Sequence, residues 1–185
     1  GESLTILAQE KNDPEIAKKA ETAAQEALKL SPKDPVIFLA SFMADVAVKD
    51  FRGAEDKSAY CLKTFPEIKE CPWLSGLINI YSNNIEKGKD FVAKAREKGY
   101  PIESETSLSQ LSLAYLENKN YKEMLPIYQK LIVANPSQVQ YKTSLALLYK
   151  YLGEYDKARE LALEVLKTNP ELKASIDEFL KTIYQ

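Results

Sequence analysis

The chain has 185 residues, of which 45% are hydrophobic and 28% are charged, so it is long enough to bury a sizeable core. Its 25 Lys and Arg residues nearly balance 27 Asp and Glu residues, and this net charge of -2 argues against nucleic acid as a partner. The absence of His excludes Ser-His and Cys-His nucleophile pairs and His-ligated zinc. We therefore assign no catalytic or metal-binding residue and expect no cofactor.

The first predicted elements are two helices. A short helix over residues 3–11 carries apolar residues at helical spacing. A second helix begins at Pro14, because proline suits the first position of a helix and Asp13 suits the cap before it. Pro32 ends this pair of helices, which we call the first unit, since a residue without an N–H stops a helix. The short first helix leads us to expect that the sequence is the C-terminal part of a longer protein.

The second unit contains the most apolar stretch, 36–48, which is interrupted by polar residues and falls short of the roughly 20 residues that cross a bilayer. We expect no membrane insertion. In the third unit, the second helix fits best when it buries Gly88, Val92 and Ala95. When the apolar positions of the first helix are aligned with those of the other units, this fit predicts that the turn between the two helices is about two residues shorter than theirs.

The fourth and fifth units have the clearest patterns. In the fourth, Leu111 and Tyr115 lie on the first helix and Tyr121 opens the second. The fifth contains the string LGEYDKA around its turn and ends at Pro170. The remaining residues predict a closing helix with one apolar stripe, formed by Leu172, Ile176, Phe179, Leu180 and Ile183. Its opposite face is charged, which is what the end of a helical stack requires.

A period of 34 residues connects these units. It separates corresponding Leu, Tyr and Pro positions, namely Leu77, Leu111 and Leu145; Tyr81, Tyr115 and Tyr149; Pro32 and Pro66; and Pro136 and Pro170. The pattern resembles the tetratricopeptide repeat, in which a Trp-x-x-Leu-Gly-x-x-Tyr helix precedes an Ala-x-x-x-Phe helix and a closing Pro. The chain therefore resembles an array of about five such repeats.

The resemblance implies an all-α fold, a right-handed α-solenoid or superhelix of stacked antiparallel helical hairpins, forming one domain over residues 1–185. The expected units are 1–34, 35–69, 70–103, 104–137 and 138–171, followed by a capping helix over 170–185. Each hairpin leaves an apolar face that its neighbour covers.

The resemblance also implies a binding groove lined by first helices. The family's phase on those helices gives these partner-binding candidates: Leu39, Met43, Val46, Ser75, Asn79, Asn83, Ser109, Leu113, Leu116, Thr143, Leu147 and Tyr151. Their apolar and amide side chains suit an extended or helical peptide. A competing interpretation is that the apolar candidates of the second unit only pack against neighbouring helices.

Two related binding classes fit less well. The subgroup that holds chaperone C-termini uses cationic side chains on successive first helices, and those positions carry no positive charge here. RNA-binding pentatricopeptide hairpins need cationic contacts that this slightly acidic chain, with only Arg52, Arg96 and Arg159 as arginines, does not offer.

We therefore expect a non-catalytic scaffold for protein–protein interaction. The alternative is a structural spacer or self-association module, forming a homo-oligomer within a larger bacterial protein that an N-terminal region attaches to a membrane. The compartment is left open.

The two cysteines allow two interpretations. Cys61 lies late in a second helix and Cys71 lies near the start of the next first helix, so the loop around Pro66 can bring them together. Two unbonded cysteines are the favoured interpretation, and a disulfide, which would imply an oxidising compartment, is the alternative.

Overall fold

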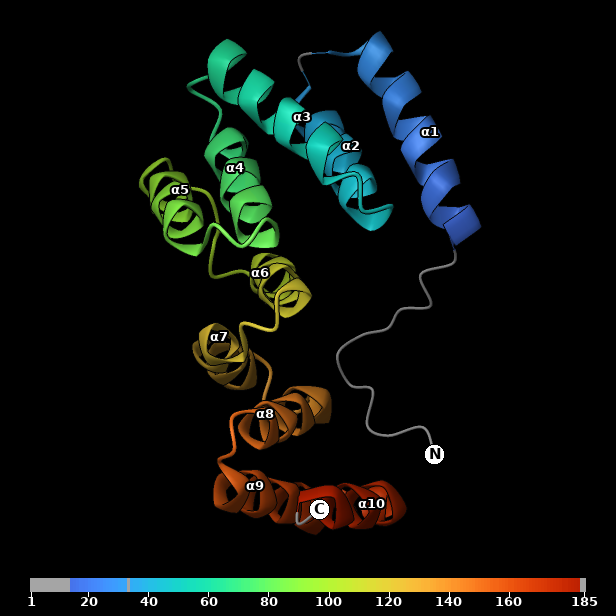
Figure 1. Ribbon diagram of the computed structural model, residues 1–185, viewed down its shortest axis with the longest axis vertical. Coiled ribbons are helices and arrows are strands. Elements are labelled where there is room, and N and C mark those ends of the chain that lie inside the picture. The colour runs from blue at the N-terminus through green and yellow to red at the C-terminus, as the bar shows by residue number, and fades with distance from the viewer. Residues whose placement is uncertain (1–13, 33, 184–185) are drawn as a thin grey trace. The chain divides into compact units, whose positions relative to one another are not determined.

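The computed structural model describes residues 14–32 and 34–183, which form ten α-helices and one short 3-10 helix (Figure 1). They divide into two compact units, an N-terminal unit that ends at Asn118 and a C-terminal unit that resumes at Lys119. The helix expected over residues 3–11 lies outside the described residues. Within the described ranges, every helix falls short of the length and apolarity needed to cross a bilayer.

The N-terminal unit contains six helices, and the first five pack in chain order. They are α1 (Pro14–Leu30), α2 (Pro35–Ala47), α3 (Phe51–Thr64), α4 (Glu70–Tyr81), α5 (Ile85–Glu97) and α6 (Glu105–Glu117). From α1 to α5, each helix contacts the next one along the chain. Helix α6 packs on α4 and not on α5, and α4 also contacts α2. The first helices α2, α4 and α6 thus form a connected row inside this unit.

The C-terminal unit contains four helices and the 3-10 turn. They are α7 (Tyr121–Ala134), α8 (Val139–Tyr151), α9 (Tyr155–Thr168), η1 (Pro170–Leu172) and α10 (Lys173–Ile183). Consecutive α-helices are again in contact, so α8 packs on α7, α9 on α8, and α10 on α9. The predicted closing helix is confirmed.

Short polar side chains start several helices. Asp34 precedes Pro35 and accepts hydrogen bonds from the backbone N–H groups of Val36 and Ile37. Ser104 accepts one from the N–H of Ser107 at the start of α6, at 3.2 Å. These contacts satisfy N–H groups that have no partner within the helix, so the capping residues determine where these helices begin.

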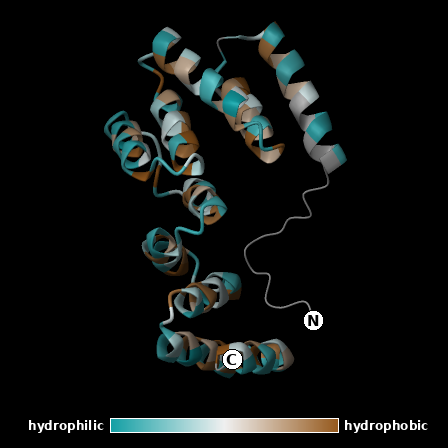
Figure 2. Cartoon of the chain, in the orientation of Figure 1, coloured by the Kyte–Doolittle hydropathy of each residue, from teal (hydrophilic) through white to brown (hydrophobic). Residues whose placement is uncertain are grey.

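Helix α4 is the centre of the N-terminal unit. All of its residues from Cys71 to Tyr81 are buried, including Trp73 and Leu77, which have no exposed surface. The paired helix α5 buries Gly88 and Ala95, as the sequence predicts, whereas Val92, which was also expected to be buried, is half-buried. Figure 2 shows the contrast, with hydrophilic colours dominating α5 and neutral or hydrophobic colours dominating α4.

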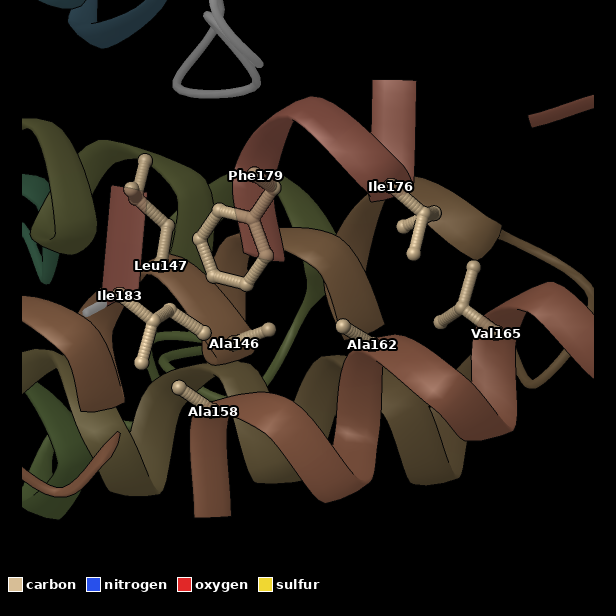
Figure 3. Packing of buried hydrophobic residues seen from close by; sticks show 8 residues of the cluster. All are labelled: Ala146, Leu147, Ala158, Ala162, Val165, Ile176, Phe179 and Ile183. Carbon is tan, nitrogen blue, oxygen red and sulfur yellow. The ribbon is translucent and has the colours of Figure 1, made fainter. Parts of the chain in front are cut away.

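The C-terminal core lies among α8, α9 and α10 (Figure 3). Its buried members are Ala146, Leu147, Ala158, Ala162, Val165, Ile176, Phe179 and Ile183. Small alanines on α8 and α9 allow these helices to approach, and the larger side chains of α10 fill the remaining space. The apolar stripe predicted for the closing helix therefore faces the core, with Leu172 and Leu180 packed at its edge.

Candidate functional site

The turns inside the hairpins set the register of the candidate residues. Three-residue turns connect α2 to α3, α4 to α5, α6 to α7 and α8 to α9. The middle residue of each turn has a positive φ, as in Lys49 (60°), Asn83 (61°), Lys119 (56°) and Gly153 (76°). Successive turns are therefore 34, 36 and 34 residues apart along the chain.

The extra two residues lie in the loop over 98–104, which precedes α6. The prediction of a shortened turn in the third hairpin is wrong, because its turn has the same length as the others. Close contact between Gly76 and Gly88 fixes the phase of α4 against α5. A Cβ on Gly88 would lie 3.0 Å from the carbonyl oxygen of Gly76, so only a residue without a side chain fits.

This register changes the candidates of the third hairpin. In the second and fourth hairpins, the predicted residues lie ten, six and three positions before the middle residue of the turn. The same count in the third hairpin gives Trp73, Leu77 and Ile80, which the sequence analysis missed. The amide-rich stretch expected in the middle of the groove is therefore not in phase with its neighbours.

The three candidates predicted in the third hairpin lie in different surroundings. Ser75 is buried, and its hydroxyl has no hydrogen-bond partner. The side-chain amide of Asn79 donates to the backbone carbonyl of Ser75 at 2.7 Å, so this donor is occupied within its own helix. Asn83 is exposed in the turn. The structure does not bring these three side chains together on one surface.

The residues that occupy the shared phase on α4 are closed off from solvent. Trp73 stacks on Tyr100 with ring centroids 4.7 Å apart. Its indole N–H donates to the side-chain oxygen of Gln110 on α6 at 3.0 Å. Leu77 and Ile80 are also fully buried. This part of the first-helix row is therefore core rather than open surface.

Contacts at the turn end close the same region. Lys49, after α2, forms an ion pair of 2.7 Å with Glu117 at the end of α6. Tyr81 stacks on Phe51, with ring centroids 5.5 Å apart. The amide of Asn118 donates to the carbonyl of Tyr81 at 2.7 Å. Burial raises the pKa of Tyr81 to about 12, and the Glu117 carboxylate acts in the same direction.

On α2, Leu39 and Met43 are half-buried and Val46 is buried. On α6, Ser109 and Leu116 are half-buried, whereas Leu113 exposes 41% of its surface. Leu113 lies in the middle of its helix, and the exposed part of its side chain contributes no apolar burial to the fold. The two helices on either side of α4 thus retain accessible apolar positions.

In the C-terminal unit the candidates differ among themselves. Thr143 is buried, and its hydroxyl donates to the carbonyl of Gln140 at 2.9 Å. Leu147 belongs to the core cluster and is only 9% exposed. Tyr151 is 49% exposed, and its ring stacks on that of Tyr121 with centroids 4.7 Å apart. Tyr151 is the most accessible of the three.

The charged side chains on the first helices are mostly engaged. Asp45 is buried and accepts a 2.6 Å hydrogen bond from the Lys57 ammonium on α3. Lys142 pairs with Glu164 at 2.8 Å. Lys150 donates to the Thr182 hydroxyl at 2.7 Å. Among the described residues, no group of three or more His, Cys, Asp or Glu side chains has an arrangement that would hold a metal ion.

A disulfide connects α3 to α4. Cys61 and Cys71 are bonded, with their Cα atoms 5.3 Å apart, and both are buried. The favoured expectation of two unbonded cysteines is therefore wrong. The loop over 65–69 reverses the chain so that the end of one hairpin faces the start of the next, which brings the sulfurs together.

Comparison with known proteins agrees with this architecture. The family model of the tetratricopeptide repeat matches residues 106–138 and 139–172. The crystal structure of TTC0263, a thermophilic TPR protein in Thermus thermophilus, is similar, with a TM-score of 0.56 and 16% sequence identity. The match covers 91% of this chain and 90% of that chain, and at this identity it concerns the fold alone. No curated protein matches the chain. Residues 106–172 are thus similar to two adjacent tetratricopeptide repeats, and the described helices have an all-α fold of the repeat-solenoid class.

Proposed function

We propose that the chain is a non-catalytic scaffold that binds a segment of another protein on the surface of its first helices. Proteins with this fold generally serve as protein-interaction scaffolds, and the family is generally non-catalytic. The observation that carries the proposal is Leu113, a helix-centre leucine with 41% of its surface exposed in the phase that the family uses for binding. An exposed apolar side chain of this kind stabilises a complex when a partner covers it.

The twelve candidate residues have different roles in this proposal. The exposed and half-buried candidates on the first helices contact the partner, and these are Leu39, Met43, Ser109, Leu113 and Leu116 in the N-terminal unit and Tyr151 in the C-terminal unit, whereas Asn83 lies in a turn and out of phase with them. The buried ones support the surface from beneath, and these are Val46, Ser75, Asn79, Thr143 and Leu147. We further propose that the five expected hairpins and α10 belong to one domain. We also propose that nucleic acid is not a partner, because the net charge is -2.

The disulfide supports an oxidising compartment for this function. Disulfides persist in secreted, periplasmic and cell-surface proteins, whereas cytosolic thiols are kept reduced. Cys61 and Cys71 are both buried, so reductants reach the bond only when the surrounding helices open.

A capture experiment with two matched variants tests the proposal. The variant Leu39→Glu/Leu113→Glu places charge on the proposed surface, whereas Val133→Glu places the same charge on a side chain that is 82% exposed on α7. Proteins captured by the wild-type chain from an extract of its source are quantified by mass spectrometry against both variants, with helicity checked by circular dichroism.

We expect at least one captured protein to be lost with the first variant and retained with the second. Retention of every captured protein by both helical variants would contradict the proposal. If the first variant changes only the oligomer size, measured by light scattering, the self-association alternative replaces it.

A further inference from the structure

The loop over 98–104, which connects α5 to α6 (Figure 1), places an aromatic ring against α4. This loop is two residues longer than the loop over 65–69. It leaves α5 at Gly99, whose φ of 79° is accessible to glycine at little cost. The next residue, Tyr100, stacks on Trp73 in the first turn of α4, with ring centroids 4.7 Å apart. A loop residue thus covers the start of the most buried helix of the N-terminal unit.

The hydroxyl of Tyr100 has a partner on α6. It forms a hydrogen bond with the hydroxyl of Ser107, which lies in the first turn of that helix. Burial is the largest cause of a raised pKa at this phenol, the hydrogen bond opposes it, and the Glu70 carboxylate adds to it. The surroundings therefore favour a neutral phenol ring over a charged one.

The groups around the Tyr100 ring are held in place by contacts that do not involve Tyr100. The indole N–H of Trp73 donates to the side-chain oxygen of Gln110 on α6 at 3.0 Å. The hydroxyl of Ser107 accepts a 2.9 Å hydrogen bond from the hydroxyl of Ser104. Trp73 and Ser107 are both buried. Their positions are thus fixed before any ring is bound, which lowers the cost of binding one.

The loop itself has weak anchors. Arg96 and Glu103 form an ion pair of 3.1 Å, but both side chains are more than half exposed, and such pairs contribute little stability in water. Lys98 donates to the carbonyl of Pro66 at 2.7 Å on the exposed surface. Within residues 98–104, Ile102 alone is buried. A segment with so little buried apolar surface opens at a lower free energy than the helices beneath it.

We propose that Trp73, Ser107 and Gln110 form a slot for a tyrosine side chain, and that the loop over 98–104 is the lid of this slot. In the closed state, Tyr100 of the same chain fills the slot. In the open state, a tyrosine from a segment of a partner protein takes its place.

The chemistry of the slot selects this side chain. The indole face stacks on an aromatic ring, and the Ser107 hydroxyl requires a hydroxyl on that ring. Glu70 disfavours a phosphorylated tyrosine, because like charges repel. The slot lies at the first turns of α4 and α6, whereas Leu113 lies in the middle of α6. This proposal therefore goes beyond the proposed function and does not depend on it.

A small molecule that mimics the tyrosine side chain tests the slot. p-Cresol is titrated into isotopically labelled protein while the NMR signal of the indole N–H is followed, which is a single signal because Trp73 is the only tryptophan. The variants are Tyr100→Ala, Tyr100→Ala/Ser107→Ala and the control Tyr155→Ala, which removes a tyrosine that is 48% exposed on α9. Circular dichroism confirms that each variant is helical.

We expect Tyr100→Ala to bind p-cresol with a Kd on the order of 1 mM, as suits a ligand of this size. Ser107→Ala should weaken p-cresol by about fivefold but change the Kd of toluene by less than about twofold, because toluene forms no hydrogen bond. p-Tolyl phosphate should bind at least about tenfold more weakly than p-cresol. The indole signal of Tyr155→Ala should not shift at these concentrations, because Tyr100 still fills its slot.

Quenching of Trp73 fluorescence by acrylamide tests the lid in the wild-type chain. Quenching should increase at urea concentrations that leave the helical circular dichroism signal unchanged, because the loop opens before the helices unfold. Tyr100→Phe keeps the stacked ring but lacks the hydroxyl, so it should show this increase at a lower urea concentration.

Either of two results would overturn the proposal. A folded Tyr100→Ala variant that does not bind p-cresol, or that binds it equally well without the Ser107 hydroxyl, would show that there is no such slot. Quenching that increases only together with loss of helicity would show that Tyr100 is a fixed part of the core and not a lid. The capture experiment with Leu39→Glu/Leu113→Glu leaves all slot residues unchanged, so failure of the proposed function is measured separately.

Discussion

Reduction of the disulfide between Cys61 and Cys71 should weaken the N-terminal unit. The cross-link spans a sequence separation of 10 residues. In the chain-entropy account, closing a loop of about 10 residues removes about 9 cal/mol/K from the unfolded state, or about 2.7 kcal/mol at 25 °C. For a unit of roughly 100 residues, a loss of this size lowers the unfolding temperature by about 10 °C.

The assay compares oxidised and reduced protein. Urea unfolding is followed by the fluorescence of Trp73, the only tryptophan in the chain, which lies two residues after Cys71 on α4. Reductant should lower the free energy of unfolding of the wild-type chain by about 2.7 kcal/mol. In the control variant Cys61→Ala/Cys71→Ala, reductant should have no effect.

Thiol titration in denaturant supplies the result that would refute this reasoning. Protein prepared in an oxidising compartment and kept without reductant should contain no reactive thiol. Two reactive thiols per chain, together with unfolding curves that are identical with and without reductant, would show that the bond does not form and would remove the argument for an oxidising compartment.

Four further changes probe other contacts. Asp45→Ala should lower the free energy of unfolding by about 3 kcal/mol in urea titrations, because it leaves the Lys57 ammonium without its buried partner; the double variant Asp45→Leu/Lys57→Met should recover most of this loss. Gly88→Ala should cost about 1–3 kcal/mol by the same measurement, since its Cβ would lie 2.6 Å from a side-chain carbon of α4. Pro126→Ala should instead stabilise α7 by about 1–3 kcal/mol, because it restores a backbone donor inside the helix. The free energy of unfolding should not change with the ionisation of Tyr81 below pH 10, and it should fall as the pH rises from 10 toward 12, because folding raises the pKa of this phenol to about 12. Tyr81→Phe should reduce that fall in thermal melts recorded against pH.

The repeat architecture could be predicted from the sequence because several residue types recur together. Leu111 and Leu145, which are 34 residues apart, are both buried on first helices. The stripe of the closing helix was also readable, since Ile176 and Phe179 alternate with charged residues at helical spacing. In these segments polar and apolar residues are well separated, so the phase of each helix has one solution.

The phase of α4 could not be predicted in this way. This helix is buried on all sides, so its apolar residues carry no period, and Leu77 and Tyr81 match the 34-residue spacing in a register that the structure does not use. The sequence spacing between the small residues at which paired helices approach closely could have predicted the phase. Gly76 and Gly88 are twelve residues apart, as are Ala146 and Ala158 in the C-terminal unit.

The candidate site was only partly readable from the sequence. The position of a residue in the helical repeat predicts the side of the helix on which its side chain lies, but the exposure of that side chain depends on whether another element covers it. Leu113 and Leu147 have equivalent positions and the same side chain, yet α10 contributes to the cluster that buries Leu147. The contact of Trp73 with Tyr100 likewise depends on the loop before α6, whose conformation has no repeat pattern.

Two buried positions differ between the third and fourth hairpins. Eight and four residues before the turn, the fourth hairpin places Leu111 and Tyr115, whereas the third places Ser75 and Asn79. Both pairs are buried, but a buried leucine contributes about 2–3 kcal/mol that a serine hydroxyl without a hydrogen-bond partner does not. A hairpin with polar residues at these positions gains less from burial, and the disulfide between α3 and α4 adds a covalent connection at this hairpin. Replacing Ser75 by Leu would not substitute for it unless the surrounding side chains made room, since the site is already filled.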